Sequence, residues 1–127
     1  MEERINVTKS YLPPIENYID CIKEIWENKQ LTNNGKFVQK LESDIKSFLD
    51  VDQFLYCNNG TIVLQIALKA LNITKEVITT PFSYVATTNT ILWEGATPIF
   101  VDINSQDFNI DVDKIEEKIT SNTEAIF

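Results

Sequence analysis

The residues best suited to chemistry form a short polar turn, Asn58–Thr61, that follows an apolar run and precedes a predicted helix. The first amides of a helix have no intrahelical acceptor, and the helix dipole places partial positive charge there. Gly60 lets a ligand approach the backbone closely, and the Thr61 hydroxyl adds a donor. The pattern predicts an anion site of the kind that binds phosphate. Capping of the helix with no ligand bound is an alternative that this pattern alone leaves open.

A second polar segment, residues 79–88, also leaves a predicted strand and enters a predicted helix. Ligands of doubly wound sheets bind where the strands end, at the carboxyl edge. An aromatic ring at this turn, Tyr84 or Phe82, can stack on a flat ligand, and the alternative is that both rings pack in the core. Asp102 follows another apolar run, where it either faces the same edge or braces a loop.

Composition excludes several classes of protein. The chain has 127 residues, 11 basic and 19 acidic side chains, a net charge of −8 and no histidine. The acidic balance disfavours nucleic acid as a partner. The absence of histidine removes Ser-His and Cys-His nucleophile pairs, and two cysteines, Cys21 and Cys57, are too few for a four-cysteine metal site. We therefore predict no metal site and no nucleic-acid binding.

No apolar run approaches the roughly 20 residues that span a bilayer, and the amino terminus lacks an apolar signal core. The two cysteines are interpreted as reduced thiols. The sequence therefore predicts a cytoplasmic protein with no membrane partner.

The elements that must position these residues alternate along the chain. Two helices are predicted first, one from Pro13 to Asn28 and one that carries Phe37 to Phe48 on an apolar stripe. Short apolar runs then predict strands at residues 54–57, 76–80, 99–103 and 125–127. Helices are predicted between them at residues 61–71, 83–94 and 111–119, with Gly95 as a stop signal. This alternation predicts an α/β fold with a parallel sheet and right-handed crossovers.

Five segments in a fixed order carry a resemblance to a known family. They are Leu31–Glu42 without Phe37, Asn59–Thr61, Pro81–Thr87, Gly95–Ile103 and Phe108–Ile126. In this order they resemble the N-terminal part of the DegT-type nucleotide-sugar aminotransferases, which are fold type I enzymes that depend on pyridoxal phosphate. The resemblance runs from about Pro13 to Phe127. It departs from the family at Ile62 and Val63, which are bulky where the family usually has small residues.

The resemblance implies transfer of an amino group, usually from glutamate, to a nucleotide-linked keto sugar in polysaccharide or deoxysugar biosynthesis. It implies that Gly60 and Thr61 bind the cofactor phosphate and that Tyr84 stacks on the pyridine ring. It also implies a homodimer, with a turn near the substrate entrance at the subunit interface. The substrate-binding residues implied in that turn are Thr32, Asn33, Asn34 and Gly35.

Family members place the Schiff-base lysine and the pyridinium carboxylate downstream of the matched segment. None of the ten lysines here has the matching context, Asp102 ends the wrong strand, and an apolar strand begins at residues 125–127 just where the chain stops. We therefore expect an N-terminal arm and helix (1–35) and a partial cofactor-binding α/β domain (36–127) truncated at its C-terminus, with no catalytic residue assigned. We expect this piece to be inactive alone. The alternative is a non-enzymatic phosphate-ligand or partner-binding module, or a remnant of that fold.

Overall fold

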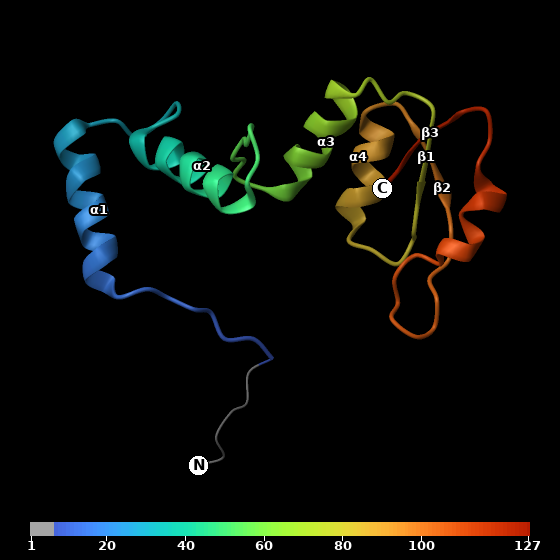
Figure 1. Cartoon of the computed structure of the whole chain (residues 1–127), viewed down its shortest axis with the longest axis horizontal. Helices are drawn as coiled ribbons and strands as arrows, with labels where there is room; N and C mark the ends of the chain where they lie inside the picture. The colour runs from blue at the N-terminus through green and yellow to red at the C-terminus, as the bar shows by residue number, and fades with distance from the viewer. Residues whose placement is uncertain (1–6) are drawn as a thin grey trace, which may run out of the picture. The chain divides into compact units, whose positions relative to one another are not determined.

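The computed structural model describes residues 7–127, and the chain divides into two compact units, Met1–Tyr56 and Cys57–Phe127 (Figure 1). The first unit contains both predicted N-terminal helices, and the second contains the sheet. The domain division predicted after residue 35 stays a prediction. Among residues 7–127, no helix combines the length and the apolar character needed to cross a membrane.

Two helices form the first unit: α1 (Ile15–Asn28) and α2 (Lys36–Leu49). α1 begins directly after Pro14, as the sequence predicts, because a proline lacks only an amide that the first turn leaves unpaired. It ends at Lys29, whose left-handed backbone (φ 57°) lets its amide donate to the Ile25 carbonyl at 2.9 Å. Both predicted helices are confirmed.

The second unit contains a parallel sheet of three strands in the order β2-β1-β3, namely β1 (Glu76–Thr79), β2 (Thr97–Phe100) and β3 (Thr123–Ile126). Helix α3 (Gly60–Ala70) precedes β1, and α4 (Val85–Trp93) connects β1 to β2. The predicted parallel α/β fold is confirmed.

The core forms around β1, which is the central strand. Val77 packs with Leu68 of α3 and Ile91 of α4, together with Ala96, so one face of the strand is covered by the two helices. Ile78 points to the other face and is also fully buried. Because both faces of β1 are covered, its sequence is apolar without alternation, which is typical of a parallel strand.

The strand predicted at residues 54–57 is wrong. These residues form an irregular segment, and the Leu55 side chain is 66% exposed. The amide of Tyr56 donates to the Glu42 carboxylate of α2 at 2.8 Å, so this part of the chain bonds to a helix and not to a strand. A short apolar run contains no periodic information that separates a strand from a connector.

The helix predicted at residues 111–119 is also wrong, because two separate 3₁₀ turns occupy it: η1 (Val112–Lys114) and η2 (Glu116–Lys118). Asp113 and Glu117 would lie one α-helical turn apart, and like charges at that spacing disfavour the α-helix. The acidic start is nevertheless a real cap, because the Asp111 side chain accepts from the Asp113 amide.

The remaining boundaries differ by a few residues. α4 begins at Val85, two residues later than predicted, and Gly95 (φ 84°) follows its end as the predicted stop. β2 ends at Phe100, earlier than predicted, because the chain then turns into a loop closed by an antiparallel bridge between Ile103 and Ile110. β3 begins at Thr123, two residues before the predicted run.

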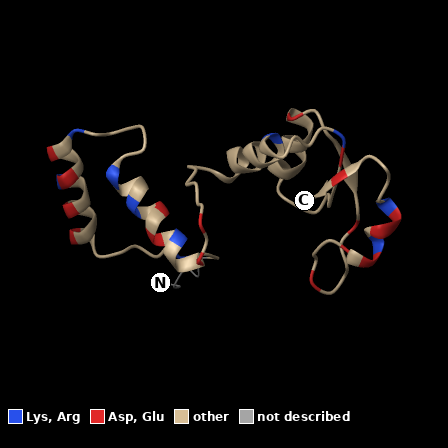
Figure 2. Ribbon diagram, turned by 45° about the horizontal axis from the view of Figure 1, so that its top comes forward, with Lys and Arg blue, Asp and Glu red and all other residues tan. Residues whose placement is uncertain are grey.

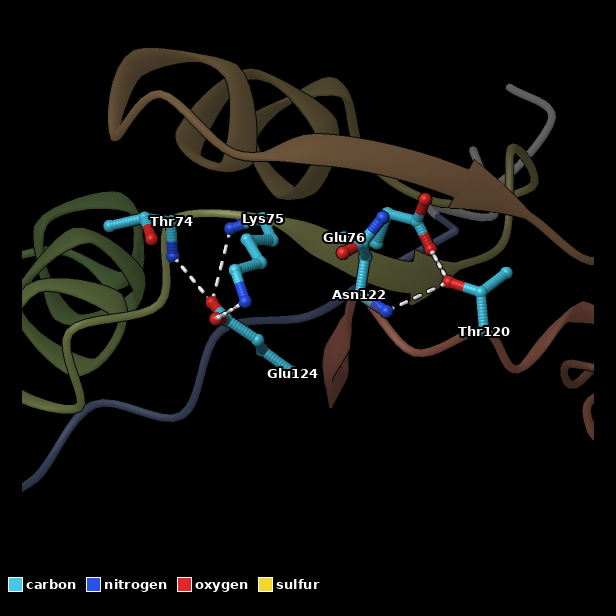
Figure 3. A network of polar contacts seen from close by, with 6 residues as sticks. All are labelled: Thr74, Lys75, Glu76, Thr120, Asn122 and Glu124. Carbon is cyan, nitrogen blue, oxygen red and sulfur yellow. Dashed lines mark hydrogen bonds and ion pairs between the residues drawn. The ribbon is translucent and has the colours of Figure 1, made fainter.

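Polar contacts tie the start of β1 to β3 (Figure 3). The Glu124 carboxylate accepts from the amides of Thr74 at 2.7 Å and Lys75 at 3.1 Å, and the Lys75 ammonium lies 3.7 Å away. On the same edge, the Thr120 hydroxyl donates to Glu76 at 2.5 Å. The hydrogen bonds from the Thr74 and Lys75 amides lower the pKa of Glu124 below its ordinary value, since they stabilise the ionised carboxylate.

This lowered pKa predicts an acid-dependent loss of stability. The ionised Glu124 contributes stability above the pKa of the unfolded carboxyl, ordinarily 4.5, and the contribution is lost as the pH falls through the lower folded pKa. We expect Glu124→Gln to lower the urea midpoint at pH 7 and to have a much smaller effect near pH 3. Urea unfolding of both proteins across this pH range provides the measurement, and an effect that stays equal at both pH values contradicts the prediction.

Candidate functional site

The polar turn Asn58–Thr61 lies at the start of α3, as predicted. Asn59 is the N-cap residue, and its side-chain oxygen accepts from the Ile62 amide at 2.9 Å. Its side-chain amide donates to the Asn58 side-chain oxygen at 3.0 Å. The capping alternative is therefore real in part: Asn59 caps the helix, but this cap uses the Ile62 amide alone.

The two amides that precede the Ile62 amide in α3 remain available to a ligand. Within residues 7–127, the Gly60 and Thr61 amides donate to no acceptor. The space beside them is open, because a Cβ atom added to Gly60 would meet no atom within 4 Å. Gly60 is exposed and Thr61 is half-buried. An anion thus has both donors and room at this corner, which is what phosphate binding at a helix start requires.

The charges near this corner suit an anion even though the chain is acidic overall. α3 has Lys69 as its single ionisable side chain, and α4 has none. Both helices are accordingly almost entirely tan in Figure 2. No carboxylate on either helix repels a phosphate, so the field at the start of α3 comes from its backbone dipoles.

The corner lies at the carboxyl edge of the sheet. Thr61, Leu64 and Leu68 share one stripe of α3, and Leu68 packs against Val77 of β1. Because a short connection joins the end of α3 to the start of β1, the helix runs back along the strand and Thr61 lies toward the end where β1 stops. α4 starts at the same end, since β1 leads into it (Figure 1). Two helix starts therefore flank one strand end.

The loop between β1 and α4 carries the predicted aromatic residues. Tyr84 is 79% exposed and Phe82 is 63% exposed, so the alternative that both rings are core is wrong for these residues. Phe82 packs against Phe108, with 6.0 Å between ring centroids. Tyr84 has no aromatic partner in the described part of the chain. Its ring is thus free to cover a flat ligand at this edge.

Threonine hydroxyls lie beneath this loop, and the sequence analysis did not single them out. Thr79 is fully buried, and its hydroxyl has no hydrogen-bond partner among the described residues. The next hydroxyl, on Thr80, accepts from the Phe82 amide at 3.3 Å, and the Thr80 carbonyl accepts from the Ser83 hydroxyl at 3.3 Å. The signal that could have indicated them is a pair of threonines where an apolar strand ends.

Asp102 braces a loop in this structure. Its carboxylate accepts from the Ile103 amide at 2.8 Å, and its carbonyl accepts from the Asp111 amide at 2.9 Å. Nearby, Asp111 and Lys114 form an ion pair at 2.7 Å that lowers the pKa of Asp111 and raises the pKa of Lys114. Of the two roles considered for Asp102, these contacts favour loop bracing.

The predicted substrate residues lie together in the first unit. Thr32, Asn33, Asn34 and Gly35 all line a hollow of about 170 Å³. Asn33 and Asn34 both have a left-handed backbone, with φ of 61° and 58°, a conformation that asparagine tolerates better than most residues. Two glutamine side chains hold the turn: Gln30 donates to the Asn33 carbonyl at 3.4 Å and Gln39 to the Asn34 carbonyl at 2.8 Å.

Three lysines of the second unit form ion pairs away from the Asn58–Thr61 corner. Lys69 lies near the far end of α3, 4.0 Å from Glu94. Lys75 precedes β1 and contacts Glu124 at the amino edge of the sheet, opposite the edge that carries the corner. Lys114 pairs with Asp111 after β2. None of these three is placed to react with a ligand bound at the start of α3.

Solved structures of other proteins share the fold of this chain. NtdA from Bacillus subtilis with bound cofactor PMP is 35% identical, with a TM-score of 0.82 over 88% of this chain and 26% of that chain. DesI, solved in the presence of its TDP-sugar product, is 26% identical, with a TM-score of 0.80 over 89% of this chain and 29% of that chain.

The model of the DegT/DnrJ/EryC1/StrS aminotransferase family matches residues 15–127, and the chain belongs to this family. A curated relative, dTDP-4-amino-4,6-dideoxy-D-glucose transaminase of Escherichia coli, is 50% identical over 125 residues. The match covers 98% of this chain and 34% of the relative. The chain thus spans about a third of the length of that enzyme. The family membership predicted from the sequence is therefore confirmed.

Substitutions at Asn59 should separate the stability of the fold from its affinity for phosphate. Asn59→Ala removes the cap and should destabilise the fold by about 0.5–2 kcal/mol. Asn59→Asp keeps an oxygen for the Ile62 amide but adds a negative charge beside the free amides, so we expect unchanged stability and roughly fivefold weaker phosphate binding. Thermal unfolding and phosphate titration measure the two effects.

The control is Asn72→Asp, which adds the same charge beyond the opposite end of α3. Equal weakening of phosphate binding by the two aspartates would show that net charge alone matters, which would contradict the prediction.

Proposed function

We propose that this chain supplies the phosphate-binding and ring-stacking residues of a pyridoxal-phosphate-dependent aminotransferase. The enzyme transfers an amino group, with glutamate as donor, to a keto sugar linked to a nucleotide. The observation that carries the proposal is the pair of unpaired amides at Gly60 and Thr61, open to solvent in a chain that the family model matches over residues 15–127.

The residues present fit the cofactor. The Gly60 and Thr61 amides and the Thr61 hydroxyl offer three donors to a phosphate, and no side chain of α3 or α4 opposes its charge. The exposed ring of Tyr84 follows β1 at the same edge of the sheet and is suited to cover one face of a pyridine ring. When bound, pyridoxal phosphate supplies an electron sink for the bonds at the amino-bearing carbon.

Each of these residues binds or orients, and none moves a proton. The helix start fixes the phosphate end, because its amides belong to a backbone that Asn59 caps and Leu68 anchors in the core. Tyr84 would cover one face of the cofactor ring and shield that face from water. With its phosphate held and one ring face covered, a bound cofactor would have its other face open to chemistry. This is the positioning contribution to catalysis.

The turn Thr32–Gly35 is our proposed contact for the nucleotide-sugar substrate, near an entrance at the interface of a homodimer. Its support is the hollow that these residues line and the likeness to two proteins, a dTDP-4-amino-4,6-dideoxy-D-glucose transaminase and DesI, which was solved in the presence of its TDP-sugar product. We place the reaction in the cytoplasm, where Cys21 and Cys57 stay reduced.

A titration of the ¹⁵N-labelled chain tests the corner. We expect inorganic phosphate and pyridoxal phosphate to shift the amide signals of Gly60 and Thr61 more than any others. Thr61→Ala removes one of three donors and should weaken binding by roughly 10- to 150-fold, since a hydrogen bond to a charged group contributes about 1.5–3 kcal/mol. Unchanged binding by Thr61→Ala would exclude the corner as the phosphate site.

The matched control is Thr97→Ala, the same substitution at the start of β2, on the opposite edge of the sheet. It should leave both titrations unchanged. Equal losses in the two variants would indicate a general effect on folding.

Borohydride reduction with pyridoxal phosphate tests whether this chain holds the Schiff-base lysine. The proposal assigns that lysine to residues outside these 127, because none of the ten lysines has the sequence context of the family's catalytic lysine, and the ion-paired Lys69, Lys75 and Lys114 lie away from the corner. We expect mass spectrometry to find only substoichiometric labelling spread over several exposed lysines. A stoichiometric adduct on a single lysine would overturn this assignment.

A further inference from the structure

Residues 104–110, in the loop after β2, form a short hydrogen-bonded segment that we call the arm, distinct from the N-terminal arm. The Asn104 amide donates to the Asn109 carbonyl at 3.0 Å, and the Asn104 side-chain oxygen accepts from the amides of Gln106 at 2.9 Å and Asp107 at 3.0 Å. The Asp107 carboxylate accepts from the Asn109 amide at 2.9 Å, and this bond lowers the pKa of Asp107. The arm, residues 104–110, therefore holds its shape through its own hydrogen bonds.

The arm carries Phe108 in a conformation that is unfavourable for it. Phe108 has a φ of 61°, in the left-handed region that glycine and asparagine tolerate and that bulky residues rarely adopt. Such backbone strain persists only where surrounding structure imposes it, and it concentrates at functional sites. Here the bonds on both sides of Phe108, from Asn104 and Asp107, impose it.

The strained residue reaches the loop that carries Tyr84. The ring of Phe108 packs on Phe82 with 6.0 Å between centroids and 35° between planes, within the range of attractive aromatic pairs. The arm and the β1–α4 loop lie at the same end of the sheet (Figure 1). The other hydrogen bonds of the loop are two bonds of 3.3 Å that Thr80 makes to Phe82 and Ser83, and a bond of 3.0 Å from the Thr87 amide to the Tyr84 carbonyl; none of them holds a ring.

Core packing does not explain this aromatic pair. Phe82 is 63% exposed and Phe108 is 58% exposed, so the pair fills no part of the interior. A strained backbone that delivers an exposed ring to another exposed ring contributes little to the fold. What the contact does is fix Phe82, two residues before Tyr84.

We propose that Phe108 is a positioning residue that acts through Phe82 to hold Tyr84 in place over the cofactor ring. The inference rests on the proposed function for the identity of the ligand, but its effect on the loop exists without ligand. The arm from β2 thereby sets the orientation of the ring-stacking residue while leaving the phosphate corner at α3 unchanged.

The test uses Phe108→Asn, because asparagine tolerates the positive φ and only the ring is lost. In the free protein, we expect amide hydrogen exchange at Phe82 and Thr87, whose amides donate to the Thr80 hydroxyl and the Tyr84 carbonyl, to be roughly two- to tenfold faster than in the wild type. On addition of pyridoxal phosphate, the ring signals of ¹³C-labelled Tyr84 should shift at most half as far as in the wild type. The shifts of the Gly60 and Thr61 amides with inorganic phosphate should not change.

Phe108→Tyr keeps a ring and should restore both the exchange rates and the Tyr84 shift, which a merely structural role would not require. Unchanged exchange and an unchanged Tyr84 shift in Phe108→Asn would overturn the inference. If the wild type shows no amide shifts with phosphate, the proposed function fails separately, and the exchange rates still decide whether Phe108 holds the loop.

Discussion

The second unit of this protein depends on the burial of β1 between two parallel neighbours. Val77 and Ile78 are fully buried on opposite faces of the strand, and β1 pairs with β2 in a register that runs from Glu76 opposite Thr97 to Thr79 opposite Phe100. That register determines where β1 ends. The end of β1 in turn determines where α4 starts and which loop carries Tyr84. The geometry of the candidate site is thus inherited from the packing of one four-residue strand.

A protein with a net charge of −8 is expected to repel phosphate, and this chain avoids the conflict by segregation. Among the described residues, acidic side chains lie on α1 and α2, in the connection from α2 to α3, at Glu76 of β1, at Glu94 and after β2, while α3 and α4 carry none. At the start of α3 the donors are backbone amides, whose partial charge is independent of pH. An anion site built this way needs no cationic side chain.

Features that depend on local chemistry could be predicted from the sequence. The Asn59–Thr61 corner, the stop at Gly95 and the start of α1 at Pro14 follow from the conformational rules of individual residue types. The parallel sheet followed from the alternation of apolar runs and helical stripes. The helix predicted after the polar turn begins at Gly60, with Asn59 as its N-cap residue.

Features that depend on partners distant in the sequence could not be predicted. Phe54–Cys57 resembles a strand by composition, but its neighbour is Glu42 of α2, which the run itself does not encode. The pairing of Phe82 with Phe108 joins two loops 26 positions apart in the printed numbering, and neither loop indicates the other. The sequence places Thr79 at the end of a predicted strand but does not show that its hydroxyl is buried without a partner among the described residues.

The side-chain hydrogen bonds between β1 and the segment of β3 lie at the amino edge of the sheet, opposite the edge that carries the proposed ligand site. Glu124 and Thr120 secure the amino edge through Thr74, Lys75 and Glu76, whereas backbone hydrogen bonds of 2.8 Å, from Val101 to Thr79 and from Phe127 to Ile78, join the strands at the carboxyl edge. Sequence drift at the carboxyl edge can therefore alter which molecule is accommodated without loosening the scaffold. Such a division allows one framework to diversify over evolution while its foldability is preserved.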